Sequence, residues 1–142
     1  MILGEIPISP IAELLGFKIT NYCDGCTTIE MDVTEKYWNA LDTLHGGVYC
    51  DLADAAMGFS FFTTLEDDET YTTVDLRITF LRAVKEGKLI ASSKIVKRGR
   101  RLGYQECELV DGEGKLVAKA SSTCIVQKIK KDLEDLKDYT SR

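Results

Sequence analysis

Hydrophobic and polar residues alternate along six segments of the chain, and this period of two is typical of strands with one buried face. The first two segments, 17–22 and 27–34, flank the dipeptide Asp24-Gly25, which favours a tight hairpin turn. The other four lie later in the chain and are separated by turns that contain glycine or charged residues. They cover residues 71–81, 88–97, 102–110 and 115–127.

Three other segments predict helices. Ser9, Pro10 and Gly16 have the residue types of an N-cap, a first helical position and a helix stop, so a short helix is expected between them. Residues 46 to about 65 are rich in alanine and aromatic side chains and predict one long helix. Near the C-terminus, apolar residues at helical spacing among charged ones predict a short surface helix. They are Ile129, Leu133 and Leu136.

The long predicted helix is apolar around most of its circumference, which is typical of a buried helix. Its two apolar arcs consist of Val48, Leu52, Ala55, Phe59 and Phe62, and of Tyr49, Ala53, Met57 and Phe61. The exception is a narrow stripe that holds Gly47, Asp51, Asp54 and Gly58. Because burying an unpaired carboxylate is costly, we expect this stripe to face a cleft or a polar partner. The alternative is that both aspartates are solvated residues on a half-exposed helix.

The predicted order is helix, two strands, long helix and four strands. Strands gathered in this way around one helix indicate an α+β fold in which an antiparallel β-sheet wraps around the long central helix. The chain has 142 residues, the size of one domain. Such a domain buries enough surface to form a core without a disulfide or metal.

Composition narrows the function classes. The chain carries 18 Lys and Arg against 23 Asp and Glu, a formal charge of -5 with a pI near 4.9. This acidic balance argues against a general nucleic-acid binder but allows a local basic patch for a small anion. No secretory signal is evident, and no segment approaches the ~20 apolar residues of a membrane span. We therefore expect a cytoplasmic protein.

The five cysteines are an odd number in a chain without an evident export signal, which favours reduced thiols. Cys23 and Cys26 form a CxxC pair, but no second pair follows and His45 is the only histidine. A zinc site would need two further ligands, so we expect no metal. The dipeptide between the two cysteines favours a hairpin turn instead.

The start of the long helix carries the candidate chemistry. A loop predicted for residues 35–44 runs into His45-Gly46-Gly47. Glycines at a helix start let a substrate approach the unpaired backbone N–H groups, where the helix dipole stabilises developing negative charge. Such N–H groups can form an oxyanion hole. For His45 alone, a structural helix cap is the simpler interpretation.

Asn39, the run Leu44-His45-Gly46-Gly47 and residues 51–58 together resemble the motif of the hotdog-fold acyl-CoA thioesterases, above all the PaaI-like, phenylacetate-pathway branch. Residues 73–82 and 114–120 are similar to the third and last strands of that family. The similarity extends from about residue 16 to residue 126. It implies a hotdog fold and hydrolysis of an acyl-CoA thioester without a metal or redox cofactor. One departure is Ala83, where relatives commonly have proline.

The resemblance also implies the roles of single residues. Asp54 matches a carboxylate that acts as general base on water or as nucleophile on the thioester carbonyl, and Gly46 matches a backbone N–H donor to the carbonyl oxygen. Asn39 would position the water or the carbonyl, Thr73 would assist the carboxylate, and His45 would shape the loop. The alternatives are a turn role for Asn39 and a simple strand role for Thr73. Further substrate contacts are expected at Gly47, Val74 and Arg82.

The spacing of two candidates predicts an oligomer. Gly46 and Asp54 are eight residues apart on one helix, which places them ~12 Å apart at ~1.5 Å per residue. One thioester cannot contact both, because catalytic contacts are about 3 Å long. If both act on one substrate, they come from two subunits, so we expect a homodimer. The resemblance implies the same shared site, commonly in a dimer of dimers.

A second chemical signal is the cationic run Lys97-Arg98-Gly99-Arg100-Arg101, which we call the basic turn. Arg98, Gly99, Arg100 and Arg101 are candidates to bind the phosphates of coenzyme A, because arginine forms bidentate contacts with phosphate. The equally weighted alternative is a solvated turn that keeps the sheet edge soluble.

Two classes of function remain from the sequence. The leading one is an acyl-CoA thioesterase. The other is a non-catalytic hotdog module that binds acyl-CoA as a sensor or carrier, and a hotdog dehydratase is a weaker third. The fold alone does not separate them, and the sequence does not specify the acyl chain.

Overall fold

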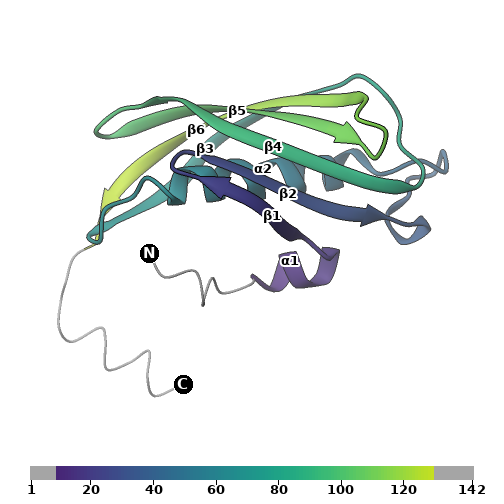
Figure 1. Ribbon diagram of the computed structural model, residues 1–142, viewed down its shortest axis with the longest axis horizontal. Coiled ribbons are helices and arrows are strands. Elements are labelled where there is room, and N and C mark those ends of the chain that lie inside the picture. The colour runs from purple at the N-terminus through teal and green to yellow at the C-terminus, as the bar shows by residue number, and fades with distance from the viewer. Residues whose placement is uncertain (1–8, 130–142) are drawn as a thin grey trace, which may run out of the picture.

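A computed structural model of the chain describes residues 9–129. One antiparallel sheet curves over the long helix α2 (Gly46–Phe62), as Figure 1 shows. The six strands are β1 (Lys18–Cys23), β2 (Cys26–Val33), β3 (Glu69–Phe80), β4 (Gly87–Arg98), β5 (Leu102–Asp111) and β6 (Leu116–Lys128). Their order across the sheet is β1-β2-β4-β5-β6-β3. The predicted α+β architecture, a sheet wrapped on one helix, is confirmed.

The two α-helices have clear start and stop signals. In α1 (Pro10–Leu15) the Ser9 hydroxyl accepts a hydrogen bond from the Ala12 N–H, and Gly16 ends the helix with a φ of 74°. The long helix α2 ends at Phe62, three residues before the predicted end. The Thr63 and Thr64 hydroxyls donate to carbonyls of its last turn at 2.7 Å and replace further helical hydrogen bonds.

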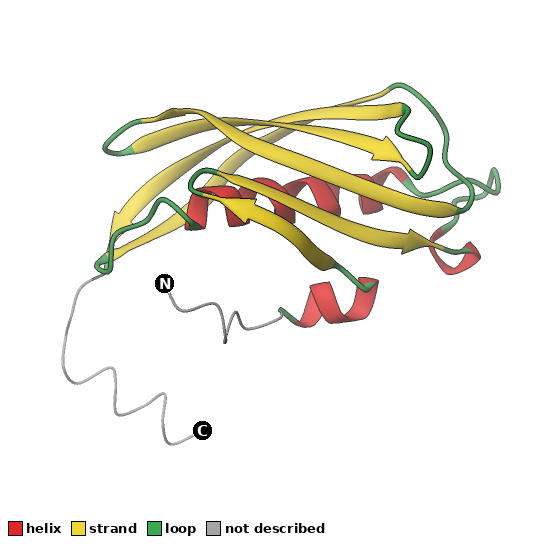
Figure 2. Cartoon of the chain, viewed as in Figure 1, coloured by secondary structure: helices red, strands yellow, loops and turns green. Residues whose placement is uncertain are grey.

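Two further differences concern loops and the C-terminus. The segment predicted as a loop contains a short 3-10 helix, η1 (Glu35–Tyr37), and an isolated bridge between Trp38 and Leu44. Figure 2 shows η1 as a short helix just beyond the end of β2. The surface helix predicted from Ile129 onward lies outside the described residues, apart from Ile129 itself.

The core lies between α2 and the inner face of the sheet. Its fully buried side chains include Met31, Leu52, Met57, Leu89 and Leu109. The prediction that α2 is buried nearly all round holds for the arc of Tyr49, Ala53, Met57 and Phe61, all of which are buried. The same prediction is wrong for most of the other arc, in which only Leu52 is buried. Val48, Ala55 and Phe59 are only partly buried and Phe62 is 40% exposed, because the sheet covers one side of the helix only.

The β1–β2 hairpin corrects the prediction of reduced thiols. Its register pairs Cys23 with Cys26 across the Asp24-Gly25 turn, with a Cα–Cα distance of 5.0 Å, and the two side chains form a disulfide. This distance lies within the range that a disulfide spans without backbone movement. Cys50, Cys107 and Cys124 are free thiols.

Strand β3 forms one edge of the sheet and pairs only with β6 among the described residues. It runs from Glu69 to Phe80, and its register shifts between Thr73 and Asp75. Val74, at this irregularity, is 52% exposed, and Phe80 at the end of the strand is 51% exposed. A long edge strand with exposed apolar side chains is a template for pairing with another chain.

Candidate active site

The first turn of α2 presents an unpaired backbone donor. His45 is the N-cap, and its Nδ1 accepts a hydrogen bond from the Gly47 N–H at 2.9 Å. Within residues 9–129, no acceptor pairs with the Gly46 N–H. Gly46 lines a surface depression of about 390 Å³ together with Asn39, Phe80 and Arg82, which we call the helix-start depression. Of the two glycines proposed for substrate contacts, only Gly46 has an N–H that is free for a ligand.

Asn39 shapes the loop before the helix. Its Oδ1 accepts hydrogen bonds from the N–H groups of Leu41 at 2.9 Å and Thr43 at 3.3 Å, and its Nδ2 donates to the Thr43 hydroxyl at 3.1 Å. Asp42, within this turn, has a φ of 58°, a conformation that aspartate tolerates better than most residues. The structure therefore shows the turn role of Asn39, while the side chain also lines the helix-start depression.

Asp54 lies in the middle of α2, opposite β3. The Thr73 hydroxyl donates to its Oδ1 at 3.4 Å, and the same hydroxyl lies 3.7 Å from the Cys124 Sγ. Partial burial raises the pKa of the Asp54 carboxyl above its ordinary value of 3.8; the Thr73 hydrogen bond opposes this shift and the nearby Asp51 adds to it. The result is a carboxylate that is more basic than a solvated one and is held by a hydroxyl.

A second depression, of about 380 Å³, surrounds this pair, and we call it the carboxylate depression. Val74 lies in its wall, as predicted for a substrate contact, and so do Cys50, Asp51 and Asp75. Burial and the two aspartates raise the pKa of the Cys50 thiol, so it remains protonated and is a poor nucleophile. Of the carboxylates in this depression, Asp54 is the one that accepts a hydrogen bond from the Thr73 hydroxyl, and it stays the candidate base or nucleophile.

The predicted residues thus fall into two separate groups on one protomer. The helix-start depression brings together Asn39, Gly46 and Arg82, and the carboxylate depression brings together Asp54, Thr73 and Val74. The two depressions share no lining residue. The eight-residue separation of Gly46 and Asp54 on one continuous helix spans ~12 Å, as the sequence predicted.

Arg98 of the basic turn contacts other parts of the fold. This side chain is paired within the fold: it forms an ion pair with Glu69 at 2.9 Å, donates to the Thr64 hydroxyl at 3.0 Å and stacks over the Phe61 ring. It also contacts the Gly99 carbonyl. These contacts occupy Nε, Nη1 and Nη2 of Arg98 within the fold, and its candidate role in phosphate binding stays a prediction.

Arg100 and Arg101 have no such side-chain contacts with residues 9–129. Both are exposed at the tip of the β4–β5 connection. At Gly99 a Cβ atom would lie 2.6 Å from the Leu102 carbonyl oxygen, so this glycine serves the close approach within the turn.

Tyr71 is a site residue that the sequence did not single out. Its hydroxyl lies 2.6 Å from the position that a Cβ atom would take at Gly58, one helical turn beyond Asp54. The available signal was the glycine itself, since glycine inside a helix costs about 1 kcal/mol and marks a close approach. Phe80, whose ring lies 3.1 Å from a Cβ position at Gly46, was missed as well.

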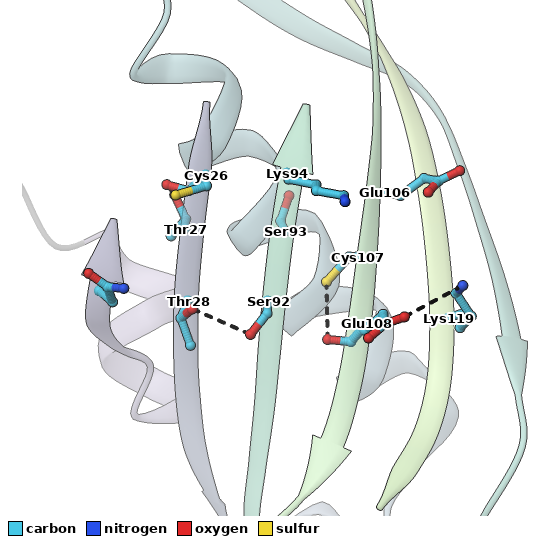
Figure 3. Close-up of a pocket in the computed structure, with 11 residues that line it drawn as sticks. Cys26, Thr27, Thr28, Ser92, Ser93, Lys94, Glu106, Cys107, Glu108 and Lys119 are labelled. Atoms are coloured by element: carbon cyan, nitrogen blue, oxygen red, sulfur yellow. Dashed lines mark hydrogen bonds and ion pairs between the residues drawn. The ribbon is translucent and has the colours of Figure 1, made fainter. Parts of the chain in front are cut away.

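The outer face of the sheet carries a third hollow, of about 550 Å³, which Figure 3 shows. Polar side chains from β2, β4, β5 and β6 line it, and several are paired: the hydroxyls of Thr28 and Ser92 lie 3.3 Å apart, and Lys119 lies 3.6 Å from Glu108. It contains none of the predicted site residues. These paired, exposed groups are typical of a solvated sheet face.

From Ser9 to Ile129 no group of three or more His, Cys, Asp or Glu residues could hold a metal ion. In the same part of the chain no helix is long and apolar enough to cross a membrane.

Comparison with known proteins identifies the family. The model of the thioesterase superfamily matches residues 41–118, which include Gly46, Asp54 and Thr73. The chain belongs to the thioesterase superfamily. Membership in this superfamily assigns it to the hydrolases that act on thioesters, and the predicted hotdog fold is confirmed.

Named relatives agree with this assignment. Human acyl-coenzyme A thioesterase 13 is 31% identical over 70% of this chain and 71% of its own length. The crystal structure of a phenylacetic acid degradation-related protein from Ralstonia eutropha is 30% identical, covers 86% of this chain and 93% of its own, and superposes with a TM-score of 0.80. The E. coli PaaI protein shares the fold, with a TM-score of 0.79, 24% identity, and coverage of 86% and 88%. The predicted PaaI-like resemblance is confirmed.

Proposed function

We propose that this thioesterase hydrolyses acyl-CoA thioesters in a site shared by two subunits. One subunit supplies Asp54 and Thr73, and the other supplies Gly46, with Asn39 and His45 holding its loop. The observation that carries this proposal is the separation of a basic carboxylate and an unpaired helix N–H on one protomer, ~12 Å apart along α2. Neither depression alone contains both groups that thioester hydrolysis needs.

The chemistry follows from these two groups. The Asp54 carboxylate removes a proton from water that attacks the thioester carbonyl, or attacks the carbonyl itself. The Gly46 N–H donates a hydrogen bond to the oxyanion that forms as the carbonyl is attacked. When water attacks, the C–S bond then breaks, the C–O bond to the water oxygen remains, and the proton passes from Asp54 to the thiolate of coenzyme A. When Asp54 attacks, breaking of the C–S bond leaves a mixed anhydride on Asp54; water then hydrolyses it to release the acid, and a proton from that water neutralises the thiolate. No metal or redox cofactor takes part in this scheme.

The unpaired edge of β3 is the contact that would unite the two halves. It carries Thr73 and the exposed Val74, so a second copy paired there would lie directly beside the carboxylate depression. We propose a homodimer formed along this edge, and a dimer of dimers as the larger assembly. In such an assembly, Arg100 and Arg101 of the basic turn, and Arg82 beside Gly46, are the exposed cations for the phosphates of coenzyme A.

The test is thiol release from coenzyme A thioesters by three proteins: wild type, Asp54→Asn and Asp51→Asn. Asp51 lies three residues before Asp54 in the same depression, so its substitution is a matched control for charge. We expect Asp54→Asn to lose at least about 100-fold in kcat with the dimer intact, and Asp51→Asn to stay within a few-fold of wild type. Tight binding without wild-type turnover would instead indicate the acyl-CoA sensor.

A further inference from the structure

An apolar groove of about 730 Å³ opens beside α2 and shares no lining residue with the carboxylate depression. The helix contributes Ala55, Phe59 and Phe62 to its wall, and β1 contributes Ile19. Tyr71 from β3 also lines the groove and lies close enough to Asp54 for the charge of that carboxylate to raise the pKa of Tyr71. Ala55 follows Asp54 directly in the sequence, so the groove begins next to the candidate base.

The two hollows that adjoin Asp54, the carboxylate depression and the groove, differ in polarity. Toward the start of α2, the carboxylate depression contains Asp51 and Asp75, whose charges disfavour an apolar acyl chain. Toward the end of α2, the groove offers the partly exposed apolar arc of the helix. A thioester whose carbonyl contacts Asp54 therefore binds most favourably with its acyl group in the groove. There the apolar surface of the acyl group is removed from water.

The Tyr71 hydroxyl is the unusual feature of this wall. It rests on Gly58, where any Cβ atom would lie 2.6 Å from it, and its ring packs against Phe61 with centroids 5.5 Å apart. Among the described residues it has no hydrogen-bond partner. Burial raises the pKa of Tyr71 to about 12, so the hydroxyl remains a donor at neutral pH. An unpaired hydrogen-bond donor is thus held at a fixed place in an apolar groove.

We propose that Tyr71 selects acyl groups that carry a hydrogen-bond acceptor oxygen about one helical turn, ~5.4 Å, from the thioester carbonyl. Gly58 lies one turn beyond Asp54 and sets this distance. Four bonds of an extended acyl chain cover a similar length, which places the acceptor on the fifth carbon. The inference rests on the proposed function, since it uses Asp54 as the point where the carbonyl is bound.

The experiment compares two coenzyme A thioesters of equal shape. One is a hexanoyl thioester with a keto oxygen on its fifth carbon, and the other has a methyl group in place of that oxygen. In Tyr71→Phe, kcat/KM should fall about tenfold or more for the keto substrate and stay within about twofold for the methyl substrate, because only the former loses a hydrogen bond. Gly58→Ala should give the same selective loss, because its methyl group displaces the phenol.

Tyr22→Phe is the matched control, because this β1 tyrosine packs on Phe59 but does not line the groove. It should leave both kcat/KM values unchanged. Equal effects of Tyr71→Phe on the two substrates, or none, would overturn the selection by Tyr71 and leave the proposed thioesterase standing. If wild type hydrolysed neither thioester, nor any of a panel of acyl-CoAs, the proposed function itself would be wrong and this inference with it.

Discussion

Asp54 shows how one residue acquires a chemical role from its surroundings. Its position in the middle of α2 removes part of its hydration, which raises the pKa of the carboxyl, while the Thr73 hydroxyl stabilises the ionised form. Asp51, on the same stripe, adds to the shift through its charge. A carboxylate with a raised pKa is a stronger base than a solvated one.

The pH dependence of activity follows from these contacts. Because the ionised carboxylate is the active form, kcat/KM should fall as the pH drops through the raised pKa of Asp54, at a higher pH than for an ordinary carboxyl. Thr73→Val removes a contact that lowers this pKa, so the acidic limb should move to still higher pH. The measurement is the profile of kcat/KM against pH for both proteins. An acidic limb that stays in place or moves to lower pH in Thr73→Val would refute this role of Thr73.

At the scale of elements, α2 carries both the candidate base, Asp54, and the free N–H of Gly46. Its N-cap, His45, fixes the first turn, where this N–H lies. The His45 Nδ1 occupies the Gly47 N–H, and this leaves the Gly46 N–H as the free donor of the first turn. The loop before it is fixed by the hydrogen bonds of Asn39. The helix start is therefore prearranged before any substrate binds.

A pair of substitutions separates capping from catalysis at His45. His45→Ala should lower the free energy of unfolding by about 1 kcal/mol, and His45→Asn should recover most of it, because asparagine is a good N-cap. Unfolding in urea measures both. We expect activity to follow stability, with His45→Asn within a few-fold of wild type. If His45→Asn were stable but as inactive as His45→Ala, the imidazole would have to contact the substrate directly.

The basic turn gives a second test at this scale. Charge reversal of Arg100 and Arg101 should raise KM for acyl-CoA by about tenfold or more and spare acyl-pantetheine, which lacks the nucleotide phosphates. Arg98→Met should instead lower the melting temperature, because it breaks the ion pair with Glu69 and the stacking on Phe61. An equal rise of KM for both substrates after charge reversal would argue against phosphate binding.

Much of the fold could be predicted from the sequence, because alternation, turn residues and caps act locally. The six strands, both helix starts and the stripe with Asp54 are present in the structure. What the sequence missed depends on distant contacts. The ion pair of Arg98 with Glu69 joins two residues that are far apart in the sequence. The position of Tyr71 depends on its packing against Gly58. The Cys23–Cys26 disulfide depends on the register of the hairpin.

At the scale of the whole molecule, the described part of one protomer presents two incomplete depressions and two sheet edges, β1 and β3, of which β3 borders the carboxylate depression. Pairing of β3 with a second copy would protect this edge, cover Val74 and bring the free helix N–H of one chain toward the carboxylate of the other. Assembly and activity are then inseparable. Dissociation into monomers should abolish turnover even though each monomer keeps every candidate residue.

Complementation between two inactive variants tests this shared site most directly. Gly46→Pro removes the N–H at the first position of α2, where proline is favoured, and the extended His45 backbone, with ψ of 135°, suits a following proline. Its added ring carbons require a small shift of the Phe80 ring, which lies 3.1 Å from a Cβ position at Gly46. Asp54→Asn removes the base. Each variant alone should be folded, dimeric and nearly inactive.

Mixed and reassembled in equal amounts, the two variants should regain about a quarter of wild-type activity, because half of the dimers are mixed and each mixed dimer has one intact site. If the Asp54 and Gly46 that act on one thioester belonged to the same chain, every site would keep one defect. The mixture would then remain inactive, and this result would contradict the shared site.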